Sequence, residues 1–174
     1  MNYASIKTHD VANGPGVRVS LFVSGCTHHC PGCFNSIAWD FDYGDAYTAD
    51  TEAAIMQALE PDYIKGLSLL GGEPFEPQNQ RELVKLLRTF RRRYPHKTVW
   101  CYSGYTYEQL TGDGRPHIDV TDEMLGMIDV LVDGRFVEEK KDLSLRFRGS
   151  GNQRIIDLAA TRAAGSIIAW DETN

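Results

Sequence analysis

Apolar and polar positions group along the chain into segments that are typical of strands alternating with helices. Four short runs rich in apolar and β-branched residues predict buried strands at 17–23, 66–70, 98–102 and 128–134. The turn sequence Asn-Gly-Pro-Gly at 13–16 precedes the first run and supports a strand that begins there. Small or polar residues follow every run, so each predicted strand ends in a loop.

Three helices are predicted between these strands and a fourth after them. The clearest has an apolar stripe at three- and four-residue spacing, formed by Leu83, Leu86, Leu87, Phe90 and Tyr94. A second helix is expected to begin near Thr48 or Asp50, where either residue can act as its N-cap. A third runs from Thr121 to Met127, and residues 154–162 are predicted as the last helix.

This alternation predicts an α/β fold with a parallel sheet and right-handed crossovers. The chain has 174 residues, whereas a complete eight-fold barrel needs about 250. An open α/β sheet or a partial barrel therefore fits, as a single domain over 1–174 with its core at about 14–158 and an unassigned tail at 159–174. In either architecture the functional loops follow the carboxyl ends of the strands.

Composition and charge exclude several classes of protein. Apolar residues make up 42% of the chain and charged residues 24%, which is typical of a soluble globular domain. The net charge of -6 argues against general nucleic-acid binding. One basic cluster, Arg91 to Arg93, is interpreted as a solvated helix end, with a docking patch for an acidic partner as the alternative.

The sequence also predicts a cytoplasmic protein. Its first ten residues lack the apolar run of a signal peptide, and no apolar stretch approaches the roughly 18 residues of a membrane span. In a reducing compartment, cysteines more often bind metals or carry out redox chemistry than form structural disulfides.

Three of the four cysteines, Cys26, Cys30 and Cys33, lie within eight residues directly after the first predicted strand. A structural zinc site needs four ligands, so His28, His29 or Cys101 would have to supply the fourth. A dithiol redox site could use Cys30 and Cys33 but leaves Cys26 without a role. A four-iron cluster held by three thiolates would keep one iron open for a substrate. Spacing alone leaves these three interpretations open, and it favours the cluster.

A second chemical signal follows the next strand, where Gly71, Gly72, Glu73 and Pro74 form a turn. Two glycines after a buried strand allow a close approach to the backbone, and Glu73 offers a carboxylate to an amino group. An ordinary strand-to-helix turn is the alternative. Because the cysteine loop follows the preceding strand in the same way, a binding role for this turn is favoured over an ordinary turn.

These motifs resemble those of the radical S-adenosylmethionine (SAM) enzymes. The segment at 26–34 is similar to their Cys-x3-Cys-x2-Cys-aromatic signature, and 71–74 is similar to their motif for the methionine amino group. More narrowly, the chain resembles the activating proteins of anaerobic (class III) ribonucleoside-triphosphate reductases. The segments that carry this resemblance are 13–18, 21–26, 30–35, 66–74, 77–79, 100–105, 130–136 and 148–153. One departure is Leu70, where family members often have Ser before the two glycines.

The resemblance implies a parallel-sheet partial (β/α) barrel of the radical SAM type. It implies that Cys26, Cys30 and Cys33 hold a [4Fe-4S] cluster whose fourth iron binds SAM. The positions that it implies for binding SAM are Gly32, Cys33, Phe34, Gly71, Gly72, Glu73 and Ser103. No further catalytic residue is implied, because the cluster and SAM carry the chemistry.

The implied reaction is the reductive cleavage of SAM to a 5′-deoxyadenosyl radical, which removes a hydrogen atom from one glycine of the reductase. The implied partners are that glycyl radical subunit and an electron donor such as flavodoxin, with neither nucleic acid nor membrane. Two alternatives remain at this point. One is a small radical SAM enzyme or activase with another partner, and the other is a non-catalytic zinc-binding adaptor.

Overall fold

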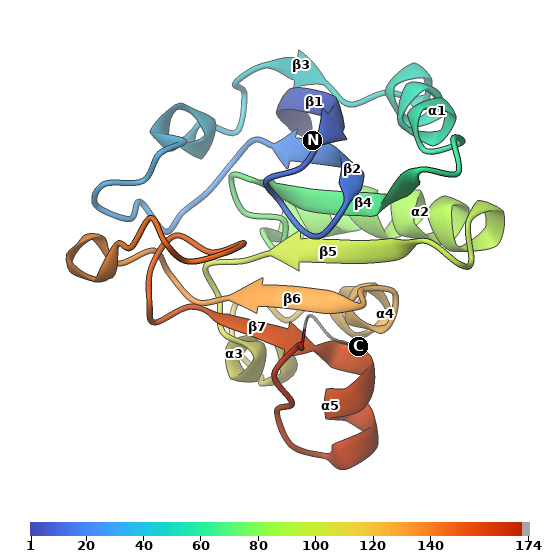
Figure 1. Ribbon diagram of the computed structural model, residues 1–174. Helices are drawn as coiled ribbons and strands as arrows, with labels where there is room; N and C mark the ends of the chain where they lie inside the picture. Colours follow the sequence, from blue (N-terminus) through green and yellow to red (C-terminus); the bar gives the residue numbers. More distant parts are fainter. Residues whose placement is uncertain (172–174) are drawn as a thin grey trace.

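The computed structural model describes residues 1–171, and it builds them around one seven-stranded sheet (Figure 1). The strand order across the sheet is β3-β1-β2-β4-β5-β6-β7. The strands are β1 (Asn2–Asp10), β2 (Val17–Val23), β3 (Asp45–Ala46), β4 (Ile64–Gly71), β5 (Thr98–Tyr102), β6 (Val130–Asp133) and β7 (Arg154–Asp157). This arrangement confirms the expected α/β class.

The centre of the sheet is parallel, but its edges are not. β2, β4, β5 and β6 pair in parallel, as the alternation of strands and helices predicts. β1 pairs antiparallel with β2 and β3, and β7 pairs antiparallel with β6. The expectation of a wholly parallel sheet is therefore wrong at both edges. Sequence reasoning assigned no strand to 2–10, where half-exposed polar residues hide the pattern.

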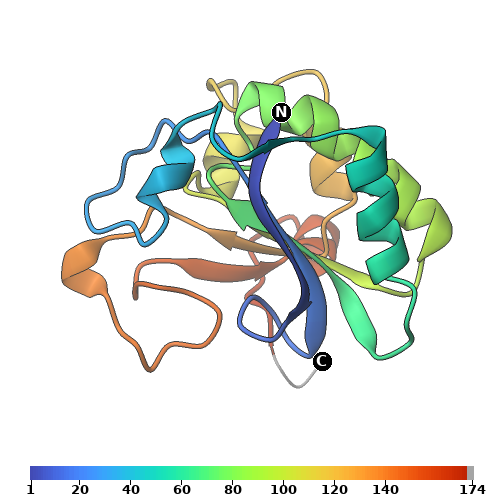
Figure 2. The same cartoon turned by 90° about the horizontal axis from the view of Figure 1, so that it is seen from above.

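Helices cover one face of the sheet (Figure 2). These helices are α1 (Ala49–Ala58), α2 (Pro77–Arg93), α3 (Tyr107–Thr111), α4 (Thr121–Gly126) and α5 (Leu158–Ala164). Two short 3-10 turns, η1 (Ser36–Trp39) and η2 (Glu138–Lys140), lie in the loops that follow β2 and β6. The main core lies between these helices and alternate residues of the central strands, including Leu21, Leu69 and Leu131. Cys101 belongs to this core and is fully buried, as a small apolar residue would be, instead of lying beside the other cysteines as a fourth ligand.

The opposite face of the sheet is covered by loops and contains both aromatic and polar groups. Trp100 packs edge-on against Phe147 and Trp170 in a smaller core. Beside it, the fully buried Arg18 donates hydrogen bonds to Ser68 Oγ and to backbone oxygens of neighbouring strands. Burial of this guanidinium lowers the pKa of Arg18 to about 10. The loop-covered face therefore differs from the helix-covered face in being partly polar.

Most predicted elements are confirmed, and the last helix needs correction. Residues Arg154–Asp157 form β7, and α5 begins only at Leu158. Ile156 is fully buried in the main core, while Ile155 packs on the opposite side of the sheet. Alternation of neighbouring side chains between the two faces of the sheet is typical of a strand, and in residues 154–157 it replaces the helix that the sequence predicts. The Asp157 side chain then accepts the Ala160 N–H and caps α5.

Other helix termini follow the sequence signals closely. Thr48 caps α1, and its side chain accepts the Thr51 N–H. Arg91 at the end of α2 is bound to Met127 O and to Asp129, so it joins two elements instead of standing as a free patch. None of the helices within residues 1–171 has the length and apolar character required to cross a membrane.

Candidate functional site

The carboxyl ends of the four parallel strands meet at a cavity of about 530 Å³. The loop after β2 carries the three clustered cysteines, and the turn after β4 carries Gly71, Gly72 and Glu73. All of these residues line the cavity, as do Ser103 after β5 and Gly134 after β6. The structure therefore brings the sequence motifs together as the strand-end argument predicts.

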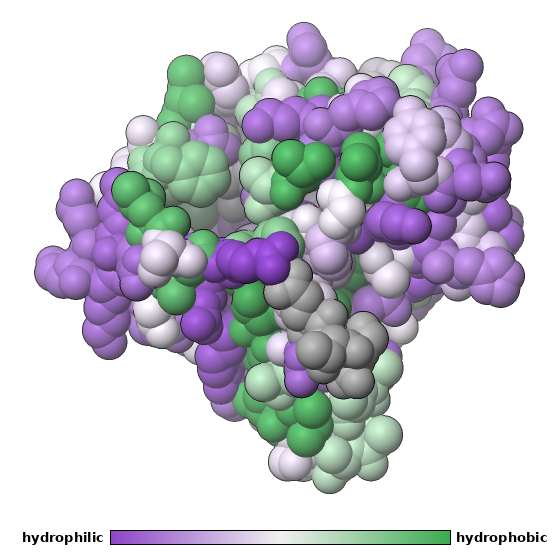
Figure 3. Space-filling model, in the orientation of Figure 1, coloured by the Kyte–Doolittle hydropathy of each residue, from purple (hydrophilic) through white to green (hydrophobic). Residues whose placement is uncertain are grey.

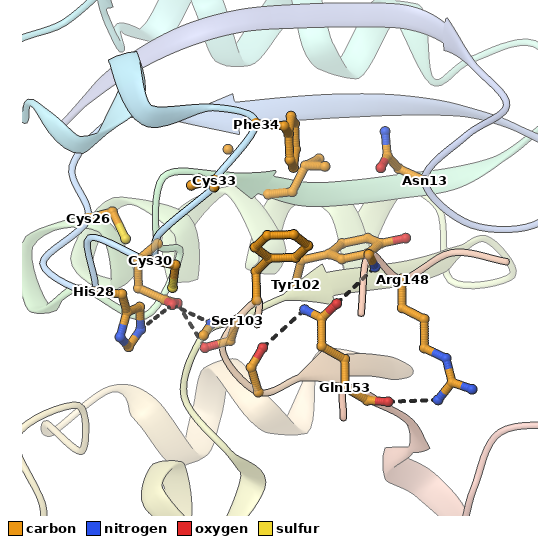
Figure 4. Close-up of a pocket in the computed structure, with 18 of the residues that line it drawn as sticks. Asn13, Cys26, His28, Cys30, Cys33, Phe34, Tyr102, Ser103, Arg148 and Gln153 are labelled. Atoms are coloured by element: carbon orange, nitrogen blue, oxygen red, sulfur yellow. Dashed lines mark hydrogen bonds and ion pairs between the residues drawn. The ribbon is translucent and has the colours of Figure 1, made fainter. Parts of the chain in front are cut away.

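The cavity is elongated, with the cysteines at one end (Figure 4). Asn13 and Arg148 lie at the other end, and Tyr102 lies between the two ends. Leu70 and Tyr102 supply part of the lining from the loop-covered face of β4 and β5. Asn13 and Arg148 belong to the segments 13–18 and 148–153, both of which carry the family resemblance.

The three loop cysteines are free thiols that surround one end of the cavity. Burial raises the pKa of the Cys26 thiol to about 12, while the backbone N–H groups of His28 and His29 lower it through hydrogen bonds. Burial also raises the pKa of Cys30, and the Phe136 N–H opposes that effect. Burial thus opposes the thiolate form of both residues, and a cationic partner such as iron would favour it.

The Glu73 carboxylate is fully buried and accepts a hydrogen bond from each of several loops. Its Oε1 accepts the Phe75 N–H and the Ser103 hydroxyl, each at 2.9 Å. Its Oε2 accepts the Gly104 N–H at 2.7 Å and lies 2.9 Å from His28 Nε2. A carboxylate has about four acceptor positions, and these four contacts use them all. Glu73 thus links the ends of β4 and β5 to the cysteine loop.

Two further polar residues of the same turn hold the cysteine loop from behind. Glu76, which is 1% exposed, accepts both the N–H and the hydroxyl of Thr27. Asn79 is fully buried, and its side-chain N–H group donates to Ser24 O at 3.0 Å. Sequence reasoning missed the roles of Glu76 and Asn79. The available signal was a second acidic residue and an amide at the strand-to-helix junction.

The two glycines of the turn make room for the chain's own backbone. A Cβ on Gly72 would lie 2.5 Å from Gly25 O and 2.9 Å from Ala38 O. The backbone N–H of Gly72 donates to Val23 O at 2.7 Å, and that of Glu73 donates to Gly25 O at 2.8 Å. The turn after β4 and the start of the cysteine loop are therefore joined by main-chain hydrogen bonds that a side chain at 72 would obstruct.

Ser103 and Asp133 have structural contacts of their own. The Ser103 hydroxyl, besides donating to Glu73, accepts the Tyr105 N–H at 3.0 Å. Asp133 is 1% exposed and binds the Arg154 guanidinium and the Tyr107 N–H. Gly134, in contrast, lines the cavity. This favours the interpretation of Asp133 as part of a strand-ending turn.

Gly32 and Phe34 lie on the cavity side of the cysteine loop. Gly32 has a φ of +70°, and a Cβ there would lie 2.7 Å from the Glu138 carboxyl carbon. The Phe34 side chain, which the resemblance implies for binding SAM, is 86% exposed at the rim of the cavity. Across the mouth lies Leu143, which is 91% exposed.

The segment between β6 and β7 forms the wall of the cavity opposite the cysteine loop. Gln153 fixes this wall, because its Oε1 accepts the N–H groups of Gly149 and Ser150 and its Nε2 donates to Gly134 O. Figure 3 shows hydrophobic side chains among hydrophilic ones at the left of the molecule, on the side of the cysteine loop and of this segment.

Comparisons with known proteins agree with this geometry. A family model described as a 4Fe-4S single cluster domain matches residues 12–156. Anaerobic ribonucleoside-triphosphate reductase-activating proteins of Escherichia coli (strain K12) and Vibrio cholerae are each 42% identical to the chain, over 88% and 89% of its length and 96% and 97% of theirs. The protein of that name from Enterobacteria phage T4 is 39% identical over 89% of this chain and 93% of its own. The chain belongs to the family of anaerobic ribonucleoside-triphosphate reductase-activating proteins.

The donor set fits the iron–sulfur cluster of a 4Fe-4S domain. Three free thiols, two of them approached by backbone N–H groups, are typical ligands for such a cluster. Within residues 1–171, no group of three or more His, Cys, Asp or Glu side chains is gathered closely enough to hold a single metal ion. A cluster, in contrast, gives each thiolate an iron of its own.

Proposed function

We propose that this protein is a radical SAM activase that generates the glycyl radical of an anaerobic ribonucleoside-triphosphate reductase. One observation carries the proposal. Three free thiols and the Gly-Gly-Glu turn line a single cavity, in a chain whose relatives are named as activating proteins of that reductase. The site and the family thus support the same chemistry from independent directions.

In this proposal Cys26, Cys30 and Cys33 hold three irons of a [4Fe-4S] cluster, and the fourth iron is free for SAM. The bound cluster would supply the one-electron reduction that cleaves SAM to methionine, and the cleaved SAM would remove a hydrogen atom from a glycine of the reductase. The residues of this chain bind and orient these groups and keep water away from them.

The proposed SAM contacts differ in kind. Gly32, Gly71 and Gly72 line the cavity beside the cysteines and offer backbone groups to SAM. Glu73 and Ser103 also line it, but their oxygens already accept or share protein hydrogen bonds. We therefore propose that Glu73 and Ser103 shape the part of the cavity that binds the methionine end of SAM. Phe34 would reach the adenine only from the rim, where its side chain is exposed.

The glycine of the reductase is proposed to enter through the mouth of the cavity, between the cysteine loop and the segment between β6 and β7. Phe34 and Leu143 expose apolar side chains at this mouth, and the cavity continues from them to the cysteines. A glycine-bearing loop is narrow enough to follow that path. The remaining parts of the proposal are an electron donor such as flavodoxin, a cytoplasmic location, and no role for nucleic acid or membrane.

We also propose that the sheet is a partial (β/α) barrel of the radical SAM type. Four parallel strands with helices on one face and the cavity at their carboxyl ends support this architecture. The antiparallel strands β1 and β7 would then close its two edges.

The deciding experiment is anaerobic reconstitution followed by electron paramagnetic resonance. The chain is loaded with iron and sulfide, reduced with dithionite, and mixed with SAM and an anaerobic ribonucleoside-triphosphate reductase. We expect 5′-deoxyadenosine together with a glycyl radical doublet on the reductase. SAM cleavage without a doublet would point to another partner, and a colourless protein with stoichiometric zinc would exclude the cluster.

A further inference from the structure

His28 lies inside the site, unlike a solvated loop residue. Its side chain is 4% exposed, and its Nε2 is 2.9 Å from Glu73 Oε2. The ring also packs edge-on against Tyr105, with centroids 4.3 Å apart. Gly104 leaves space for it, because a Cβ there would be 2.4 Å from the ring Cδ2. The ring therefore occupies a fitted position among the ends of three strands.

The hydrogen-bond pattern around Glu73 fixes which atom of His28 carries a proton. Glu73 Oε2 already accepts the Gly104 N–H, and an ionised carboxylate can only accept. We therefore assign the hydrogen to Nε2 of His28, which donates to Glu73. This contact joins the middle of the cysteine loop to the turn after β4.

The backbone of the same residue points at the first cysteine. The N–H groups of His28 and His29 lower the pKa of the Cys26 thiol, as donors close to its sulfur do. These peptide units are held in an uncommon conformation, because His29 has a φ of +48°. Because the His28 ring is bound to Glu73, the N–H groups of His28 and His29 stay directed at the Cys26 sulfur. Hydrogen bonds to ligand sulfurs stabilise the reduced, more negative form of an iron–sulfur cluster and so raise its reduction potential.

We propose that His28 is a positioning residue for the iron–sulfur cluster. Its ring, anchored on Glu73, holds the cysteine loop so that two backbone N–H groups bond to the Cys26 sulfur and raise the reduction potential of the cluster. His28 is not a ligand in this proposal. The role of His28 depends on the proposed function in one respect, which is that an iron–sulfur cluster is present. Otherwise the two claims are separate.

The test compares two side chains of similar size that differ in their ability to donate. His28→Leu fills the space without a donor, while the amide of His28→Gln can donate to Glu73. Each full-length variant is reconstituted anaerobically, and its midpoint potential is measured by a redox titration followed by electron paramagnetic resonance. We expect a more negative potential and about tenfold faster loss of iron to a chelator for His28→Leu. His28→Gln should restore both to wild-type values.

His117→Leu is the matched control, because it removes a contact of the same kind outside the site. His117 Nε2 lies 3.0 Å from Asp122 Oδ1, and neither residue lines the cavity. We expect the wild-type potential for this variant, and circular dichroism checks that all three variants are folded. Wild-type potential and iron retention in His28→Leu would overturn the proposal. So would a folded His28→Gln that behaves like His28→Leu.

These readouts do not involve the reductase, so the two proposals fail in different ways. A loaded wild-type chain that gives no glycyl radical contradicts the proposed function, yet the potentials of the His28 variants are still measured. Equal potentials in an active wild type and His28→Leu contradict only the role of His28.

Discussion

Cys101 and the three loop cysteines are the same chemical group in two different settings. Cys101 is fully buried in the core between the sheet and the helices, where burial raises the pKa of its thiol well above the usual value. Cys26, Cys30 and Cys33 line the cavity, and backbone donors approach the first two. Position in the fold, more than residue type, separates a packing role from a ligand role.

Replacing each cysteine by alanine separates these roles. We expect Cys26→Ala, Cys30→Ala and Cys33→Ala to lose most of the bound iron and the cleavage of SAM, because a ligand is missing. Cys101→Ala should keep its iron and lose only about 1 kcal/mol of unfolding free energy, through a small cavity. Iron analysis after anaerobic reconstitution and denaturant titration measure the two effects. Loss of the cluster in Cys101→Ala would show that the ligand assignment is wrong.

Gly72 offers a second prediction at the residue scale. Gly72→Ala introduces a Cβ about 2.5 Å from Gly25 O, so the turn and the cysteine loop must move apart. We expect a loss of about 1–3 kcal/mol in unfolding free energy, as for other overpacked sites, together with a lower iron content.

Gly126→Ala at the end of α4 is the matched control, because no atom lies within 4 Å of a Cβ placed there. Its unfolding free energy should equal or slightly exceed that of the wild type, because Ala favours a helix more than Gly does, and its iron content should be unchanged. Equal behaviour of both alanine variants in urea titrations would contradict the close approach at Gly72.

At the scale of elements, β7 shows how a strand is fixed by ion pairs at its start. Arg154 donates to Asp133 of β6 and, through two nitrogens, to Glu108 of α3. Three elements are thus joined at one guanidinium, beside the sheet pairing of β6 and β7. This arrangement explains how a strand of four residues is held at the edge of the sheet.

The ion pair predicts a dependence of stability on pH. Hydrogen bonds from Arg154 lower the pKa of Glu108 from 4.5 to about 2. A lowered folded-state pKa contributes stability above pH 4.5 that is lost as the pH falls towards 2. Because the Glu108 side chain is 59% exposed, we expect its contribution at neutral pH to be under about 1 kcal/mol.

Glu108→Gln tests this expectation. The variant should melt slightly below the wild type at pH 7, and the difference should disappear as the pH approaches 2. Calorimetry across this range, on variant and wild type together, measures the effect. A difference that persists unchanged to low pH would mean that the carboxylate charge is not its source.

At the scale of the whole molecule, the sheet divides the protein into two unlike halves. The helix-covered side is an apolar core, while the loop-covered side contains Arg18, Trp100 and the elongated cavity. The cavity runs from the cysteines to a mouth with exposed apolar side chains. A partner segment that enters through this mouth therefore contacts the loops of this second half.

Leu143 tests the proposed entrance for the reductase. It is 91% exposed at the mouth, where an entering segment of the reductase would cover it. We expect Leu143→Ser to raise the reductase concentration needed for half-maximal radical formation by about tenfold, since burying one leucine contributes roughly 1.5 kcal/mol. Ile168→Ser, away from the residues that line the cavity, is the control. Similar concentration dependence in both variants would exclude this mouth as the entrance.

The sequence by itself determined the central strands, the main helices and the three cysteines with their neighbouring Gly-Gly-Glu turn. These features depend on local periodicity, capping and spacing, which a single chain displays directly. The tertiary structure alone decided the antiparallel edges of the sheet, the anchoring of His28 by Glu73 and the support of Thr27 by Glu76. The two side-chain contacts join residues more than 40 positions apart, and only the packing of the strand ends brings their buried polar groups close enough to satisfy one another.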